Sequence, residues 1–213
     1  MSIEQYQGNL FESGDSCETI VIKERGLDLE YRPRFLDANL TASWFEQLLT
    51  QTSWKQDRVT VYGKEHLTPR LSCWMGDHWM RYTYAQNTMQ PVTWQALPLL
   101  IKAHIEAALG DQFNSVLMNY YRDGQDSNGW HADNEPELGH APTIASLSLG
   151  ASRDFQLREI KNRANKYSIT LEPGSLLVMR NGTQRYWHHQ VPKRVSAGAR
   201  INLTFRKIVK GSG

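Results

Sequence analysis

The sequence predicts a mainly β protein with flanking helices, an α+β fold in which two helices precede an all-β body. Two observations favour this fold class. Before Gly110 two segments repeat apolar residues at helical spacing, and after Gly110 the pattern changes to short strands separated by turn residues. Seven or so short strands at this spacing are typical of a sandwich, a jelly roll or a barrel. No Gly-, Ser- or Pro-rich linker separates the two parts, so we expect one globular unit.

The N-terminal part is predicted to begin as an irregular arm over residues 1–36, with one strand at Thr19–Ile22. An amphipathic helix is expected at residues 40–51, capped by Asn39 or Thr41. Its apolar face is formed by Leu40, Trp44, Phe45, Leu48 and Leu49.

A second helix is expected from Pro98 to Leu109. Pro98 suits the first turn of a helix, and Gly110 suits its end. Most of its apolar stripe consists of Leu99, Ile101, Ile105 and Leu109.

The β body is predicted from alternating apolar residues. Turns are expected at Asp123-Gly124, Asn128-Gly129, Pro173-Gly174 and Asn181-Gly182. The predicted strands are Ser115–Tyr121, Ile144–Leu149, Asp154–Arg158, Tyr167–Leu171, Ser175–Met179, Tyr186–Gln190 and Arg200–Lys207.

Charge is divided unevenly along the 213 residues. From Arg153 to the end, 13 Lys and Arg residues stand against three acids, a net charge of +10, whereas the first 152 residues carry −8. Such asymmetry indicates a strongly charged partner, of which nucleic acid is the usual one.

Composition excludes several classes of protein. No apolar run approaches the roughly 20 residues of a membrane span, and the polar N-terminus lacks a signal-peptide pattern. Two cysteines give neither a disulfide framework nor a thiolate cluster. We therefore expect a protein with no membrane partner that is not secreted, cytoplasmic in a bacterium or nuclear in a eukaryote.

The first candidate site is His131-Ala-Asp133. One His and one carboxylate two residues apart, with a more distant His, are the ligands of the facial triad that holds non-haem Fe(II). The distant ligand is His188 or His189, which are adjacent and point to opposite faces of a strand. The sequence spacing does not choose between them.

The second candidate is the segment Arg200–Arg206, where polar and apolar residues alternate. Arg200, Asn202, Thr204 and Arg206 share one face of the predicted strand. If that face points inward, two guanidinium groups need an anionic partner, and a dicarboxylate co-substrate fits them. If it points to solvent, this is an ordinary edge strand. Asn119 and Tyr121 share a face of another strand and offer hydrogen bonds to a carboxylate.

These residues belong to six motifs that follow one another in order, and together they resemble the AlkB family. That family contains Fe(II)- and 2-oxoglutarate-dependent dioxygenases that remove alkyl groups from nucleic-acid bases. The resemblance runs from about Val61 to Lys207, and it is similar in particular to the branch that repairs DNA in animal nuclei. The motifs are Met118–Asp123, Asp126–Leu138, Ile144–Gly150, Arg153–Phe155, Trp187–Pro192 and Arg200–Arg206, with Val61–Lys64 and Pro69–Trp74 also in register.

The resemblance implies a double-stranded β-helix (jelly roll) with N-terminal helices and a nucleotide-recognition lid. Residues 1–36 would be an arm, residues 37–110 the helices and lid, and residues 111–210 the catalytic core. It also implies Fe(II), 2-oxoglutarate and O2, with His131, Asp133 and His189 as metal ligands. The implied 2-oxoglutarate site contains Asn119, Tyr121, Arg200, Asn202 and Arg206.

The implied reaction is oxidative dealkylation of N-alkylated bases in DNA, such as N1-methyladenine and N3-methylcytosine, coupled to conversion of 2-oxoglutarate to succinate. The alternatives are the same chemistry on RNA, tRNA or a protein side chain, and a non-catalytic jelly roll that binds nucleic acid. We expect a monomer that flips the target base out of single-stranded or duplex DNA. The implied substrate contacts are Tyr62, Lys64, Arg70, Tyr82, Tyr84 and Glu135. Phosphate contacts are expected from the basic residues of 153–166 and from Arg180, Arg185, Lys193 and Arg194.

Overall fold

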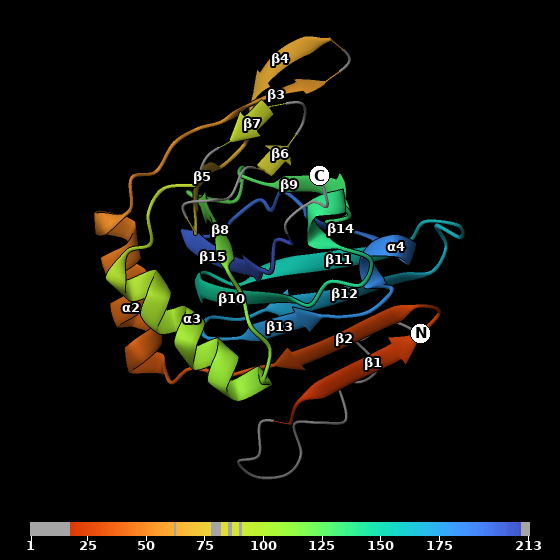
Figure 1. Cartoon of the computed structure of the whole chain (residues 1–213), viewed down its shortest axis with the longest axis horizontal. Helices are drawn as coiled ribbons and strands as arrows, with labels where there is room; N and C mark the ends of the chain where they lie inside the picture. Colours follow the sequence, from red (N-terminus) through yellow and green to blue (C-terminus); the bar gives the residue numbers. More distant parts are fainter. Residues whose placement is uncertain (1–17, 62, 78–81, 85–86, 90, 210–213) are drawn as a thin grey trace.

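The computed structural model describes residues 18–61, 63–77, 82–84, 87–89 and 91–209. Two antiparallel sheets form its body, and helices cover one face of the larger sheet (Figure 1). The arrangement is consistent with the jelly-roll fold that the sequence predicts.

The large sheet has seven strands, and its central strands β10, β15 and β8 carry much of the interior. In spatial order its strands are β1 (Ile20–Glu24), β2 (Leu27–Arg32), β13 (Leu176–Met179), β10 (Ile144–Gly150), β15 (Arg200–Arg206), β8 (Ser115–Tyr121) and β5 (Leu71–Gly76).

The small sheet has four strands and packs over the other face of the large sheet. In spatial order they are β12 (Lys166–Leu171), β11 (Arg153–Glu159), β14 (Trp187–Val191) and β9 (Asn128–His131). Two separate hairpins, β3–β4 (Arg58–Val61 and Lys64–Leu67) and β6–β7 (Tyr82–Tyr84 and Asn87–Met89), pair with neither sheet. The remaining elements are the helices α2 (Ala38–Gln51), α3 (Ala96–Leu109) and α4 (Thr183–Tyr186) and a 3₁₀ turn at Pro136–Leu138.

Alternation along the large sheet creates two apolar layers. On β13, Leu176 and Val178 pack towards α2 and α3, whereas Leu177 and Met179 pack towards the small sheet. The same alternation on β15 turns its apolar residues to the helices and its polar residues to the space between the sheets. This confirms the inward orientation of the Arg200–Arg206 polar face.

Both predicted helices are present, with differences at their starts. Asp37, not Asn39 or Thr41, caps α2, because its Oδ1 accepts the N–H of Leu40 at 2.9 Å. Helix α3 begins at Ala96, two residues early, and ends at Gly110 in the left-handed conformation with φ 72°. The predicted stripe is wrong at Leu99, which is 43% exposed.

All seven predicted strands are present, and the structure has further strands that the sequence pattern does not predict. The prediction of an irregular arm with one strand is wrong at Leu27–Arg32, since this segment is β2 and pairs with β13. The predicted turn at Asn128-Gly129 is also wrong, because these residues begin β9.

The described helices were compared with the length and hydropathy that a membrane span requires, and none of them reaches both.

Candidate active site

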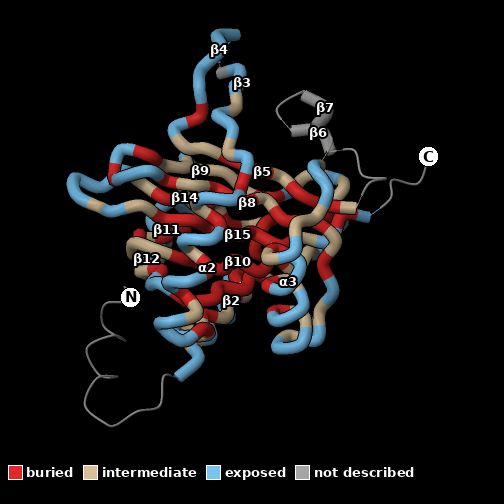
Figure 2. Tube along the Cα trace, turned by 90° about the vertical axis from the view of Figure 1, so that its left-hand side faces the viewer, coloured by how far each residue is buried: buried red, intermediate tan, exposed pale blue. Residues whose placement is uncertain are grey.

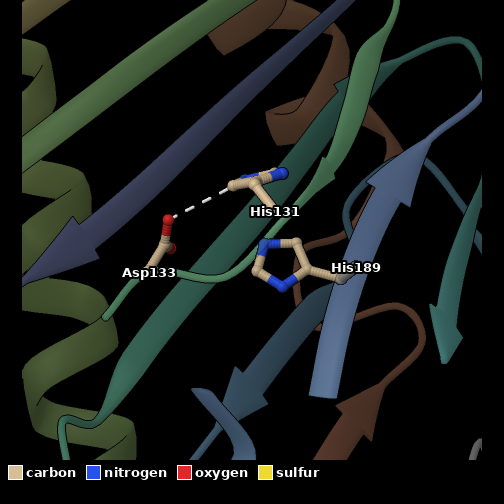
Figure 3. Close-up of side chains that lie close together, drawn as sticks. All are labelled: His131, Asp133 and His189. Carbon is tan, nitrogen blue, oxygen red and sulfur yellow. Dashed lines mark ion pairs between the residues drawn. The ribbon is translucent and has the colours of Figure 1, made fainter. Parts of the chain in front are cut away.

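Three candidate metal ligands lie together between the sheets. His131 ends β9, Asp133 follows it in a loop, and His189 lies on β14 directly opposite His131 in the strand register (Figure 3). Their ligand atoms all lie within 4.8 Å of one another, and His131 Nε2 is 3.8 Å from Asp133 Oδ1. His188 points to the other side of β14, as adjacent residues of a strand must.

The His131 ring is held by the backbone of its own strand. Its Nδ1 lies 2.7 Å from the carbonyl oxygen of Gly129. Because a carbonyl oxygen only accepts hydrogen bonds, Nδ1 carries the proton, and the lone pair of Nε2 accepts from Asn128 Nδ2 at 3.3 Å. The His189 ring stacks on Phe155 with a centroid distance of 5.2 Å.

Electrostatics set the protonation states of the two buried groups. Burial alone would raise the pKa of the Asp133 carboxyl, but the Arg206 guanidinium and the two histidine rings hold that pKa well below its usual range. Burial, reinforced by His131, lowers the pKa of His189 to about 3. A charged carboxylate and a neutral imidazole are the states in which metal ligands bind.

Two further side chains fix the Asp133 loop. Arg206 Nη2 donates to Asp133 Oδ2 at 2.6 Å. Gln184, on the short helix before β14, accepts the backbone N–H of Asp133 at 2.9 Å. Since β14 carries His189, Gln184 ties the two ligand-bearing segments together, and sequence reasoning gave no signal for it.

The donor set fits Fe(II). Two imidazoles and one carboxylate are the facial-triad ligands, and they leave further coordination positions for a co-substrate and oxygen. The group also faces a cavity of about 440 Å³ that runs between the two sheets. A metal bound there would therefore have protein ligands on one side and ligand-accessible space on the other.

Two buried arginines flank Tyr121, which lines the cavity together with Arg200. The guanidinium carbons of Arg200 and Arg153 lie 5.2 Å and 5.4 Å from the Tyr121 ring centroid. Burial lowers the pKa of Arg200 to about 10, and the nearby Arg153 cation acts in the same direction. Arg200 Nη2 donates to Ser148 Oγ at 3.0 Å, but its buried Nε and Nη1 have no hydrogen-bond partner among the residues that the structure describes. Buried, unsatisfied donors on a cation call for an anion in the adjacent cavity.

The two asparagine side chains on the same wall differ in whether their amino groups already donate hydrogen bonds. Arg70 Nε donates to Asn119 Oδ1 at 2.9 Å, which turns the Asn119 amino group away from Arg70. Asn202 is saturated, because its Nδ2 donates to Ser146 Oγ and Leu147 O while its Oδ1 accepts from Thr204. Both asparagines line the cavity, and of the two only Asn119 has an amino group without an acceptor in the described part of the chain.

The predicted substrate contacts are spread over several elements. Glu135 and Arg70 line the cavity, whereas Lys64 lies exposed on β4 and does not. Tyr62 lies outside the described residues. Tyr82 and Tyr84 form β6, and their side chains also lie outside what the structure describes.

Two of the expected phosphate contacts are corrected by burial and pairing. Arg153 is fully buried and donates to the carbonyl oxygens of Asp123, Asp126 and Pro192, so it cannot reach a phosphate. Arg180 is paired with Asp111 at 2.5 Å. A count of charges in the sequence does not distinguish such internal arginines from surface ones.

Comparisons with known proteins give one family and several relatives. The model of the 2OG-Fe(II) oxygenase superfamily matches residues 28–206. The Bos taurus protein named alpha-ketoglutarate-dependent dioxygenase alkB homolog 3 is 41% identical over 186 residues, which cover 83% of this chain and 64% of that protein. This chain therefore spans less than two thirds of that relative's length.

A second relative and a solved structure extend the comparison. The Homo sapiens protein named DNA oxidative demethylase ALKBH2 is 37% identical over 198 residues, covering 88% of this chain and 76% of that protein. The solved structure of OsALKBH1 superposes with a TM-score of 0.61 at 14% identity, over 89% of this chain and all of that one, which shows a shared fold.

Proposed function

This chain belongs to the 2OG-Fe(II) oxygenase superfamily, and we propose that it is a dioxygenase that removes alkyl groups from N-alkylated bases in DNA. One observation carries the proposal. A facial-triad donor set and a buried arginine with unsatisfied donors face the same cavity. The cavity therefore offers ligands for a metal and, close to them, a hydrogen-bonding cation for an anionic co-substrate. The name of one relative, DNA oxidative demethylase ALKBH2, supports DNA as the substrate.

His131, Asp133 and His189 are the proposed iron ligands. Arg200, which lines the cavity, is the proposed partner of the far carboxylate of 2-oxoglutarate, and Tyr121 lies beside it. Arg206 and Asn119 are assigned to the end nearer the metal, since Arg206 contacts Asp133 and Asn119 has free amide donors. Asn202 is assigned to the same wall, where its hydrogen bonds orient Ser146 and Thr204.

When bound, iron would allow O2 to oxidise 2-oxoglutarate and the N-alkyl group together: one oxygen atom would go to succinate, with release of CO2, and the other would hydroxylate the N-alkyl carbon. The hydroxylated product would then separate into aldehyde and free base. The residues of this chain provide geometry and exclusion of water. Arg206 keeps the Asp133 carboxylate charged, and Gly129 fixes the His131 tautomer. Phe155 and Met179 line the cavity with apolar surface.

The proposed substrate is a base flipped out of the nucleic acid, because a stacked base cannot reach a metal between two sheets. Glu135 is proposed to meet the positive charge of an N1-methyladenine or N3-methylcytosine. Tyr82 and Tyr84 are proposed to contact the base, and Tyr62 to fill the gap that the base leaves. Lys64 and Arg70 complete the proposed substrate contacts; hydrogen bonds from Arg70 to Asn119 and Ser127 give it a second role in orienting Asn119.

The proposed regions of the chain are an arm at residues 1–36, helices and lid at residues 37–110, and the catalytic core at residues 111–210, acting together as a monomer. The hairpins β3–β4 and β6–β7 fall in the lid region, and all proposed metal ligands fall in the core.

The test is a product assay with oligonucleotides that contain one N1-methyladenine or N3-methylcytosine. The iron-loaded protein with 2-oxoglutarate and oxygen is expected to release formaldehyde and succinate in equal amounts, and His131→Ala is expected to release neither. No product from the wild-type protein on DNA overturns the proposal. Matched RNA oligonucleotides decide whether the same chemistry is directed at RNA instead.

A further inference from the structure

Arg153 places a cation at a position of β11 where the strand pattern calls for an apolar side chain. Phe155 and Leu157, which share its face of the strand, are buried, and Phe155 stacks on His189 between the sheets. Arg153 is itself fully buried, and among the described residues it forms no ion pair with a carboxylate. A buried cation without a carboxylate is costly, so packing alone does not account for an arginine here.

The Arg153 guanidinium joins two loops next to the site. It donates to the carbonyl oxygens of Asp123 and Asp126, which lie in the loop between β8 and β9, and to that of Pro192, which follows β14. Strand β8 ends at Tyr121, whereas β9 and β14 carry two of the candidate metal ligands. One side chain therefore fixes the ends of three strands that form the site.

The two loops are in close contact beside Arg153. Arg194 donates its backbone N–H to the carbonyl oxygen of Gly124 at 2.8 Å, and a Cβ on Gly124 would lie only 2.1 Å from the Arg194 carbonyl oxygen. The loop of Arg194 leads into β15, whose first residue is Arg200. The position of Arg200 therefore depends on the same contact.

Arg153 and Arg200 also act on the same aromatic ring. Both guanidinium carbons lie within 5.5 Å of the Tyr121 ring centroid, and the Arg153 cation contributes to the lowered pKa of Arg200. Two neighbouring buried cations repel each other, and an anion bound beside them relieves the repulsion. Arg153 is not among the residues that line the cavity, so it can act on a ligand there only through Tyr121, Arg200 and its own field.

We propose that Arg153 is a positioning residue, which holds Tyr121 and Arg200 in the arrangement that binds the far carboxylate of 2-oxoglutarate. The inference rests on the co-substrate site of the proposed function and is independent of which alkylated base is oxidised. Arg153 then strengthens binding at the far end of the co-substrate and has no part in its contact with the metal. A ligand that chelates the metal but lacks a far carboxylate should not depend on Arg153.

The experiment titrates the Co(II)-loaded full chain with 2-oxoglutarate and with oxalate, and measures both affinities by calorimetry. Oxalate chelates a metal through its two carboxylates and has no far carboxylate, so it reports on the metal end alone. Arg153→Met removes the cation and its donors, and the affinity for 2-oxoglutarate is expected to fall about tenfold while that for oxalate is unchanged. Arg122→Met, which removes the more exposed arginine that pairs with Asp126 in the same loop, is the matched control and should change neither affinity.

The ratio of the two affinities distinguishes positioning from damage to the fold. If Arg153→Met lowers both affinities by the same factor, or leaves both unchanged, the inference is overturned. If this variant does not fold, Arg153→Lys replaces it, since lysine keeps a cation with donors but loses the planar guanidinium near the Tyr121 ring. The ratio should then fall about threefold, and an unchanged ratio overturns the inference.

Arg200→Met separates a failure of the inference from a failure of the proposed function. A ratio that falls in Arg200→Met but not in the Arg153 variant overturns the inference alone. A ratio that is unchanged in Arg200→Met overturns the co-substrate site itself, on which the proposed function depends.

Discussion

The wall of the cavity has two regions that are built in different ways: an inner half, formed by the candidate metal ligands and Arg200, and an outer half, formed by Arg58 and Val59 of the β3–β4 hairpin. Around the inner half, Asp133, Asn202 and Arg200 lie on or between paired strands, and all three are buried. Several hydrogen bonds hold both Asp133 and Asn202 in place. The outer half borders the β3–β4 hairpin, whose strand β4 is exposed along its whole length and projects from the buried body (Figure 2).

The difference separates chemistry from recognition. A two-stranded hairpin without a further sheet partner is only marginally stable by itself, so its position responds readily to a bound ligand. The large sheet, which forms one wall of the inner half, has an apolar layer on each face and adjusts less readily. Substitutions in the inner half should therefore affect metal and co-substrate binding steeply, and those in the hairpin should affect nucleic-acid binding mildly.

The largest effect expected in the inner half is a loss of stability in acid. The folded-state pKa of His189 is about 3, below the roughly 6.5 of an unfolded histidine, so the unfolded state binds more protons between these values. Stability contributed by the neutral ring is present above pH 6.5 and falls as the pH drops towards 3. At pH 4 the loss is about 3 kcal/mol, at about 1.4 kcal/mol for each pH unit.

Urea unfolding of the metal-free protein between pH 7 and pH 4 measures this effect. His189→Gln, which cannot be protonated, should flatten the dependence, whereas His66→Gln on the exposed strand β4 should not. The lowered folded-state pKa of Asp133 adds a smaller slope close to pH 4, because an unfolded Asp, with a pKa of about 3.9, begins to bind protons there. Identical slopes for His189→Gln and the wild-type protein would contradict the prediction.

The second effect concerns the buried Arg200. In Arg200→Met the co-substrate loses its proposed charge-assisted hydrogen bonds, and KM for 2-oxoglutarate should rise roughly a hundredfold. Steady-state kinetics with varied 2-oxoglutarate measure the rise. Arg185→Met removes an exposed arginine that stacks on Tyr186, and it should leave KM unchanged. An equal KM in both variants would remove Arg200 from the co-substrate site.

A smaller effect is expected where the inner half is tied together by Gln184. Gln184→Leu keeps much of the volume but leaves the N–H of Asp133 without its acceptor, so affinity for a divalent metal should fall about 10- to 100-fold. Calorimetric titration of the metal-free protein with Co(II) measures it. Gln156→Leu, which removes an amide paired with Gln190 on the small sheet, serves as the control. A fall of the same size in the control would show that Gln184 has no special link to the metal ligands.

The smallest effect belongs to the hairpin. Lys64→Gln removes one exposed cation from β4, and the slope of log affinity for DNA against log salt should decrease by about 1. Anisotropy titrations at several salt concentrations give this slope. Lys102→Gln on α3, where the lysine pairs with Glu106, should leave the slope as it is. If Lys64→Gln changes the slope no more than Lys102→Gln does, the hairpin does not contribute to DNA binding and the prediction is contradicted.

Much of the fold followed from the sequence because its signals are local. Gly110 ends α3 in the left-handed conformation, and seven strands lie where alternation predicts them. Errors arose where a local signal was overridden by pairing. Asn128-Gly129 has turn chemistry, yet β14 pairs with these residues as a strand. Leu27–Arg32 was read as irregular, yet β13 makes it part of the large sheet.

By itself, the sequence determined the ligand types, the two-residue spacing of His131 and Asp133, and the common face of Arg200, Asn202, Thr204 and Arg206. These depend on periods of a few residues, which any strand imposes. Only the tertiary structure decided that this face is internal, that Arg153 is buried beside Tyr121, and that Gln184 accepts a hydrogen bond from the backbone of Asp133. Such relations join residues dozens of positions apart, and packing between sheets sets them, because neither burial nor a distant partner is encoded in a local pattern.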